Sequence, residues 1–88
     1  MKIKDGFLLR EIANTPVLVP VAERVIDFKG MMVLGGVSPA IVEFIKEHRT
    51  REEILEHILG EFDIDRDTAE NDLAVLLDRM EAVGIMEQ

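Results

Sequence analysis

Three aspartates at alternate positions, Asp63, Asp65 and Asp67, are the residues of this 88-residue chain whose spacing most resembles a chemical site. Alternating aspartates open a calcium loop, which also requires glycine at its sixth position and glutamate at its twelfth. Thr68 and Ala74 stand at those positions here. The pattern therefore fails as a calcium site and predicts a helix N-cap followed by first-turn acids, which the helix dipole favours.

The other groups with catalytic potential lack the neighbours that catalysis requires. His48 and His57 fall in different predicted helices and are not at i, i+4 spacing, so we expect surface or helix-end histidines. Gly35-Gly36 lacks the remainder of a phosphate-binding motif and predicts a turn. The absence of cysteine excludes thiolate metal sites and thiol nucleophiles. We therefore expect no catalytic residue, no metal and no cofactor, and hence not an enzyme.

Composition narrows the classes of partner. The formal net charge is −8, from 18 acids and 10 bases, and such a field opposes nucleic acids and anionic membranes. There is no tryptophan or tyrosine to stack on single-stranded bases. No apolar run approaches a signal peptide or a membrane span, so we expect a cytoplasmic protein. The length predicts one domain over residues 1–88.

Alternation of apolar and other residues predicts a β-hairpin near the N-terminus. Met1–Gly6 is interpreted as a polar lead-in. Residues 7–13 form the first predicted strand, with a core face and a partly solvated face. Asn14-Thr15-Pro16 is the predicted turn, and Val17–Val19 is the returning strand.

Met31–Leu34 is the predicted third strand, because a short apolar run here ends at a glycine pair. We expect one of its two methionines in the core and the other near an edge, since neighbouring strand residues face opposite sides. Two interpretations stay open for the preceding segment. Either Ala22–Lys29 is a connecting loop, or Val25–Phe28 pairs locally with the third strand.

From Ser38 onward the apolar spacing changes to that of helices. Ser38 is the predicted N-cap of a first helix that ends near His48-Arg49. Thr50 and Glu53 form a capping box that opens a second helix. A third and longest helix is predicted from Asp65 to Val83, and we expect its core stripe to consist of Ala69, Leu73, Leu76, Leu77 and Met80. The residues after it are expected to fold back onto the core.

The predicted fold class is α+β: a three-stranded antiparallel sheet followed by three helices, in the manner of a small winged helix-turn-helix-like domain. Such a sheet has edges, and an open edge can accept an extended peptide. Asp72, Val75, Arg79 and Ala82 share one edge of the third helix, outside the core stripe. This line either walls a groove beside the third strand or is an ordinary solvated flank with one exposed valine.

Nearly the whole chain resembles the PqqD-like proteins, peptide chaperones also called RiPP recognition elements. The resemblance rests on the collinear order of GFLLREI, VLVP, IDFKGMMVL and RTREEILEHILGEFDIDRDTAENDLAVLLDRMEAVGI. It implies a domain that binds the leader segment of a ribosomally made precursor peptide as an added strand. The peptide would lie between the third strand and the third helix and be presented to a modifying enzyme, commonly a radical SAM enzyme.

Carried onto this sequence, the resemblance implies peptide-binding residues on the third strand and the third helix: Val33, Leu34, Asp72, Val75, Leu76 and Arg79. The implied partners are the precursor peptide and a peptide-modifying enzyme, as in the synthesis of pyrroloquinoline quinone or of another modified peptide. The acidic charge favours a leader with basic residues, and an open strand edge also allows a homodimer.

Two other classes remain open. One is a winged-helix DNA-binding regulator, which the many acids of the third helix oppose. The other is a structural subunit that docks an enzyme without touching its substrate.

Overall fold

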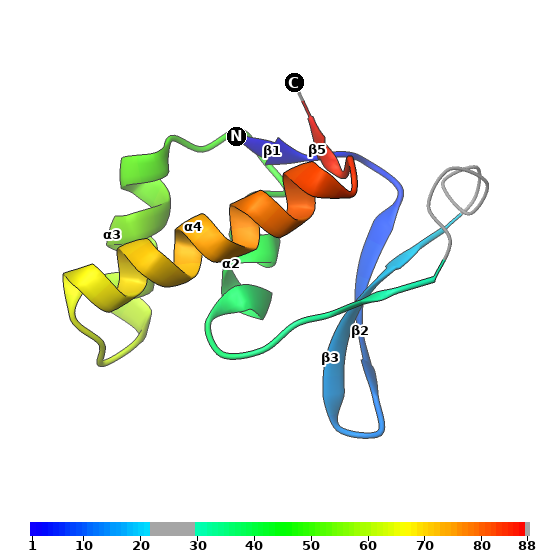
Figure 1. Ribbon diagram of the computed structural model, residues 1–88, viewed down its shortest axis with the longest axis horizontal. Coiled ribbons are helices and arrows are strands. Elements are labelled where there is room, and N and C mark those ends of the chain that lie inside the picture. The colour runs from blue at the N-terminus through cyan, green and yellow to red at the C-terminus, as the bar shows by residue number, and fades with distance from the viewer. Residues whose placement is uncertain (22–29, 88) are drawn as a thin grey trace.

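The computed structural model describes residues 1–21 and 30–87 of the chain (Figure 1). The elements follow one another as β1 (Lys2–Ile3), β2 (Phe7–Ile12), β3 (Thr15–Pro20), β4 (Met32–Val33), α2 (Ser38–Phe44), α3 (Arg51–Glu61), α4 (Arg66–Ala82) and β5 (Met86–Glu87). This order confirms the predicted α+β fold, with a three-stranded antiparallel sheet ahead of three helices. Both interpretations of residues 22–29 fall outside the described residues.

Strands β2 and β3 form the predicted hairpin, but its turn lies earlier than expected. Their register runs from Phe7 opposite Pro20 to Ile12 opposite Thr15. The two turn residues are Ala13 and Asn14, with φ of 51° and 65°. A two-residue turn with both residues left-handed matches the twist of a hairpin. The predicted turn Asn14-Thr15-Pro16 is therefore wrong: it begins one residue late and ends two residues late, and Thr15 and Pro16 belong to β3.

Strand β4 lies at one edge of the sheet, which has the order β2-β3-β4. It is one residue shorter than the predicted strand at each end, and at its C-terminal end the next residue on β3 is a proline. The Leu34 amide donates to the Pro16 carbonyl at 2.9 Å, but Pro16 has no N–H to return. Met32 is buried whereas Met31 is 52% exposed, as the alternation of a strand requires.

A second, two-stranded sheet joins the two ends of the chain, where the sequence predicted only a polar lead-in. Strand β1 pairs antiparallel with β5, and Ile3 lies opposite Met86 (Figure 1). Ile3 is buried, so the lead-in contributes to the core. Ile85 and Met86 are buried as well, which confirms that the residues after the last helix fold back.

Helix α2 begins and ends differently from the prediction. Its N-cap is Val37, without a side-chain cap, so Ser38 is the first helical residue instead of the cap. The helix ends at Phe44, well before His48-Arg49. Its last carbonyls are bound by other groups: the Arg49 Nε donates to the Phe44 carbonyl, and the Ile3 amide donates to the Ile45 carbonyl. These contacts replace the next helical turn.

The starts of α3 and α4 confirm the predicted caps. The Thr50 hydroxyl accepts from the Glu53 amide while the Glu53 carboxylate accepts from the Thr50 amide, which completes the capping box. The Asp65 carboxylate accepts from the Thr68 amide at 2.7 Å. These hydrogen bonds from backbone amides lower the pKa of Glu53 and of Asp65.

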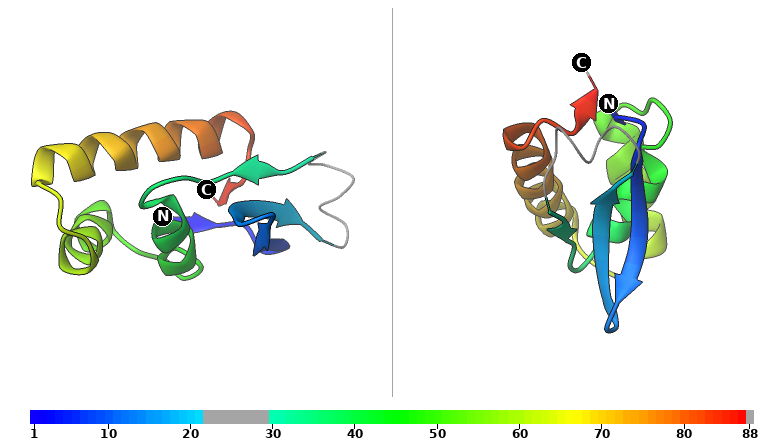
Figure 2. Two further views of the ribbon diagram at one scale, coloured as in Figure 1. Left: turned by 90° about the horizontal axis from the view of Figure 1, so that it is seen from below. Right: turned by 90° about the vertical axis from the view of Figure 1, so that its right-hand side faces the viewer.

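Helix α4 packs its predicted stripe against α2, α3 and the sheet. All five residues of that stripe are buried. The core continues through Leu18 and Met32 of the sheet and Ile41 of α2. Figure 2 shows α4 lying along one side of the molecule, with β4 and the segment that leads to α2 running beside it. This arrangement places an edge strand next to the outer flank of α4.

Candidate functional site

The backbone of Val33 faces the open edge of the sheet. Leu34 donates inward to Pro16, and Val33 lies opposite Val17 in the same antiparallel ladder. In such a ladder, consecutive residues alternate between pairs that exchange hydrogen bonds and pairs that do not. Because Leu34 bonds toward β3, the N–H and C=O of Val33 point away from it. Val33 is thus the residue of β4 that can offer both backbone groups to an added strand.

Helix α4 provides the wall opposite this edge. The Arg79 Nη2 donates to the Val33 carbonyl at 3.1 Å, so the two elements lie within reach of one side chain at this point. Next to this contact, α4 and the segment that follows β4 border a hollow of about 280 Å³. Its lining comes from the segment after β4 and from one flank of α4: Gly35, Gly36, Val37, Ser38, Asp72, Val75, Leu76 and Arg79.

The structure brings most of the six predicted site residues together. Asp72, Val75, Leu76 and Arg79 all line the hollow, and the Val33 carbonyl lies against Arg79. Val75 is 53% exposed and is available to a ligand. Leu34 is set apart, because its side chain is buried in the core and its amide is bound to Pro16.

Sequence reasoning missed the second wall of the hollow. It assigned Gly35-Gly36 to a turn, which the hydrogen bond from the Ser38 amide to the Gly35 carbonyl confirms, but it did not predict that these residues also face α4 across the hollow. A Cβ atom added at Gly35 or at Gly36 would meet nothing within 4 Å, so the space beside these two glycines is open. The available signal was their position directly after an edge strand.

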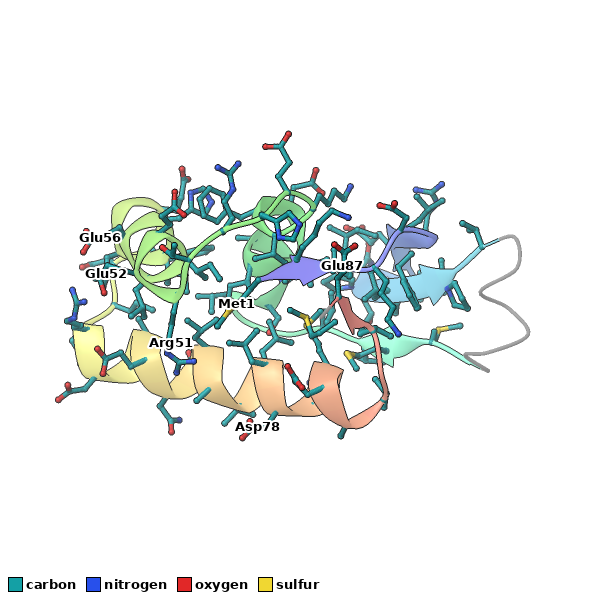
Figure 3. The ribbon with its side chains drawn as sticks, turned by 90° about the horizontal axis from the view of Figure 1, so that it is seen from above. Met1, Arg51, Glu52, Glu56, Asp78 and Glu87 are labelled. Atoms are coloured by element: carbon teal, nitrogen blue, oxygen red, sulfur yellow. The ribbon has the colours of Figure 1, made fainter. Side chains whose placement is uncertain are left out.

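The hollow is lined by one acidic side chain, Asp72, and one basic side chain, Arg79. Neither forms an ion pair within residues 1–21 and 30–87. Arg66, at the other end of α4, contrasts with Arg79. It binds Glu52, Glu56 and Glu70, and these contacts raise the pKa of Arg66 and lower the pKa of Glu52. Figure 3 shows Glu52 and Glu56 on the side of α3 next to the start of α4.

A second hollow, of about 400 Å³, lies between α2 and α3 and has a different character. The rings of Phe44 and His57 are stacked at 4.1 Å, and the Arg49 guanidinium lies 4.2 Å from the centre of the Phe44 ring. These contacts occupy its aromatic surface, and none of its lining residues belongs to a strand. His48 lies elsewhere, 3.3 Å from the carboxylate of Glu87.

Other kinds of site find no support in the described part of the chain. No group of three or more histidine, cysteine, aspartate or glutamate side chains there could hold a metal ion. No helix among those residues has the length and apolar character needed to cross a bilayer.

These features define a small α+β domain with a hollow between a helix and the segment that follows an edge strand. The sequence profile described as "PqqD: Coenzyme PQQ synthesis protein D (PqqD)" matches residues 17–86, and the chain belongs to this family. The chain is also similar to a solved structure titled "TbiB1 in Complex with the TbiA(beta) Leader Peptide", with 28% sequence identity and a TM-score of 0.72. That match covers 99% of this chain and 95% of the other. A comparison with the curated proteins gives no match.

Proposed function

We propose that this protein is a non-catalytic peptide chaperone that binds the leader segment of a ribosomally made precursor peptide. The segment joins β4 as an added strand and is covered on its other side by α4. The protein then presents the precursor to a peptide-modifying enzyme, of which a radical SAM enzyme is the kind we expect. Membership of the PqqD family and the likeness to a protein solved with a leader peptide support this proposal.

The observation that carries the proposal is the outward-facing backbone of Val33 beside an open hollow. Backbone hydrogen bonds to an edge strand bind many sequences, whereas pockets beside the strand select particular side chains. The exposed side chains of Val33 and Val75 offer an apolar surface on either side of the added strand. No redox or acid–base chemistry is required of these residues.

The charges of α4 favour a peptide over DNA. A helix that binds the phosphate backbone needs free cations. Arg66 is bound by three glutamates, and Arg79 is accompanied on its helix by Asp67, Asp72 and Asp78. A gel shift at low salt tests this point, and we expect no retarded duplex at micromolar protein.

Selection from a displayed library of random twelve-residue peptides on the immobilised full chain tests peptide binding. Synthetic copies of the enriched peptides are then titrated into the ¹⁵N-labelled chain. We expect the largest shift changes at the amides of Val33, Gly35 and Val75. Changes centred on Phe44 and His57 instead would place the binding site between α2 and α3 and contradict the proposal.

The enzyme-presenting role needs a separate test. A pull-down with the enzymes encoded beside this chain, with and without the precursor peptide, separates a peptide chaperone from a subunit that only docks an enzyme. We expect the precursor to be captured by the chaperone without the enzyme. Capture of the enzyme alone, with no peptide bound under any condition, would favour the docking subunit.

A further inference from the structure

The hydrogen bond between Arg79 and Val33 occupies a backbone carbonyl that an added strand would bind. A peptide that extends the sheet must donate to the outward carbonyl of Val33, and Arg79 already donates to it at 3.1 Å. Both residues are exposed, so the contact can open without disturbing the core. Binding of a strand therefore releases the guanidinium, which then needs another acceptor.

The helix offers Arg79 no such acceptor. On a helix, side chains three and four residues away are the neighbours that can pair. For Arg79 these are Val75, Leu76, Ala82 and Val83, all apolar. Asp72 lies two turns away, roughly 10 Å along the helix. Asp78 points away from α2 and α3 into solvent (Figure 3).

Within the described residues, Arg79 shares the lack of a nearby carboxylate with Lys4, Arg10 and Arg51, but of these four cations Arg79 alone lines the hollow. Lys2, Lys46, Arg49 and Arg66 each lie within 4 Å of at least one carboxylate. Within residues 1–21 and 30–87, Arg79 has a hydrogen bond to a backbone carbonyl and no carboxylate partner, although the chain carries 18 acids. An arginine fork is well suited to a carboxylate, which it can bind with two parallel hydrogen bonds.

We propose that Arg79 selects leader segments that carry an aspartate or glutamate next to the residue paired with Val33. In the free protein Arg79 caps the Val33 carbonyl; in the complex it transfers to the carboxylate of the peptide. This inference rests on the proposed peptide binding and adds one local requirement to it. The surrounding acidic field favours basic residues elsewhere in the segment, so a single acid at one position distinguishes the effect of Arg79 from the effect of net charge.

The test is the same random-peptide selection carried out in parallel on the wild type, Arg79→Gln and Arg79→Glu. Circular dichroism and thermal unfolding first establish that each variant folds. We expect wild-type selections to enrich aspartate or glutamate at one fixed position, Arg79→Gln to lose that enrichment, and Arg79→Glu to enrich lysine or arginine there.

Titration of one enriched peptide then measures the pairing directly. Replacing its acid by the matching amide should weaken binding to the wild type about fivefold or more, and binding to Arg79→Gln less than twofold. Equal losses in both proteins would overturn the inference, as would selected peptides without a fixed acid. Val75→Asn separates the proposed peptide binding from the proposed role of Arg79. If this variant abolishes binding of peptides that lack a fixed acid, peptide binding beside α4 is supported and only the role of Arg79 is refuted. If no selected peptide depends on Val75, both proposals fail.

Discussion

Val75 offers a direct measure of how much the groove contributes to peptide binding. Complete burial of a valine side chain contributes about 1.5–3 kcal/mol. Val75 is 53% exposed in the free protein, so a bound peptide can add roughly half of this, about 0.8–1.5 kcal/mol. Val75→Asn removes that contribution and places an amide against the peptide, where desolvation of an unpaired polar group costs about 1–3 kcal/mol.

The expected loss is therefore about 2–4 kcal/mol, which corresponds to roughly a 30-fold or larger increase in Kd. Isothermal titration with a selected peptide measures it. Asparagine and valine have similar helix propensities, so the free energy of unfolding should change by less than about 0.5 kcal/mol.

Ile12→Asn is the matched control. Ile12 is 49% exposed, lies on β2 at the end of the hairpin, and does not line the hollow. We expect this variant to bind the peptide as the wild type does. Equal Kd values for Val75→Asn and the wild type, or equal losses in both variants, would refute the reasoning.

Three further predictions concern the second wall and the helix ends. Gly35→Leu should keep the fold, since a Cβ at this position meets no atom within 4 Å. Its side chain should occupy the hollow and raise the Kd of the peptide about tenfold, as measured by titration. Thr50→Ala should lower the free energy of unfolding in urea by about 1 kcal/mol through loss of the capping box. Stability should fall on acidification: Asp65 and Glu53 have pKa values lowered by folding, so their stabilisation is present above their unfolded pKa values and is lost as pH falls through the folded ones. Thermal unfolding from pH 6 to pH 3 checks the direction, and Asp65→Asn should flatten the dependence.

Each of these has an outcome that contradicts it. Undiminished binding by Gly35→Leu would show that the peptide does not pass Gly35 and Gly36. Gly60→Ala, on the distant helix α3, serves as the control. An unchanged urea midpoint for Thr50→Ala would mean that the cap forms no net stabilising contact. A melting temperature that rises toward pH 3 would reverse the sign assigned to the carboxylates.

The helices and the core were predictable because their signals are local. The stripe of α4, its Asp65 cap and the Thr50 capping box each depend on residues of a single helix and its cap, and all of them are confirmed. The predicted α+β order follows from the change in apolar spacing at Ser38.

The errors arose where distant segments decide the local structure. The end of α2 is set by Ile3 and Arg49, which bind its last carbonyls from outside the helix. The pairing of β1 with β5 joins opposite ends of the chain and leaves no periodic signal in a two-residue strand.

The lining of the hollow was predictable on the helix side and not on the side of the segment after β4. The spacing of Asp72, Val75 and Arg79 places them on one helix edge, and the hollow confirms that they share a surface. The position of Gly35 and Gly36 opposite α4, and the contact between Arg79 and Val33, depend on how the segment after β4 packs against α4. The spacing of residues in the sequence carries no information about that packing.

The exchange rate of the Val33 amide hydrogen tests strand addition most directly. This N–H faces the open edge of β4 in the free protein, so it should exchange readily. Saturation with a selected peptide should slow its exchange at least tenfold, because the added strand supplies the acceptor. An unchanged rate at Val33 under full occupancy would contradict peptide binding at this edge.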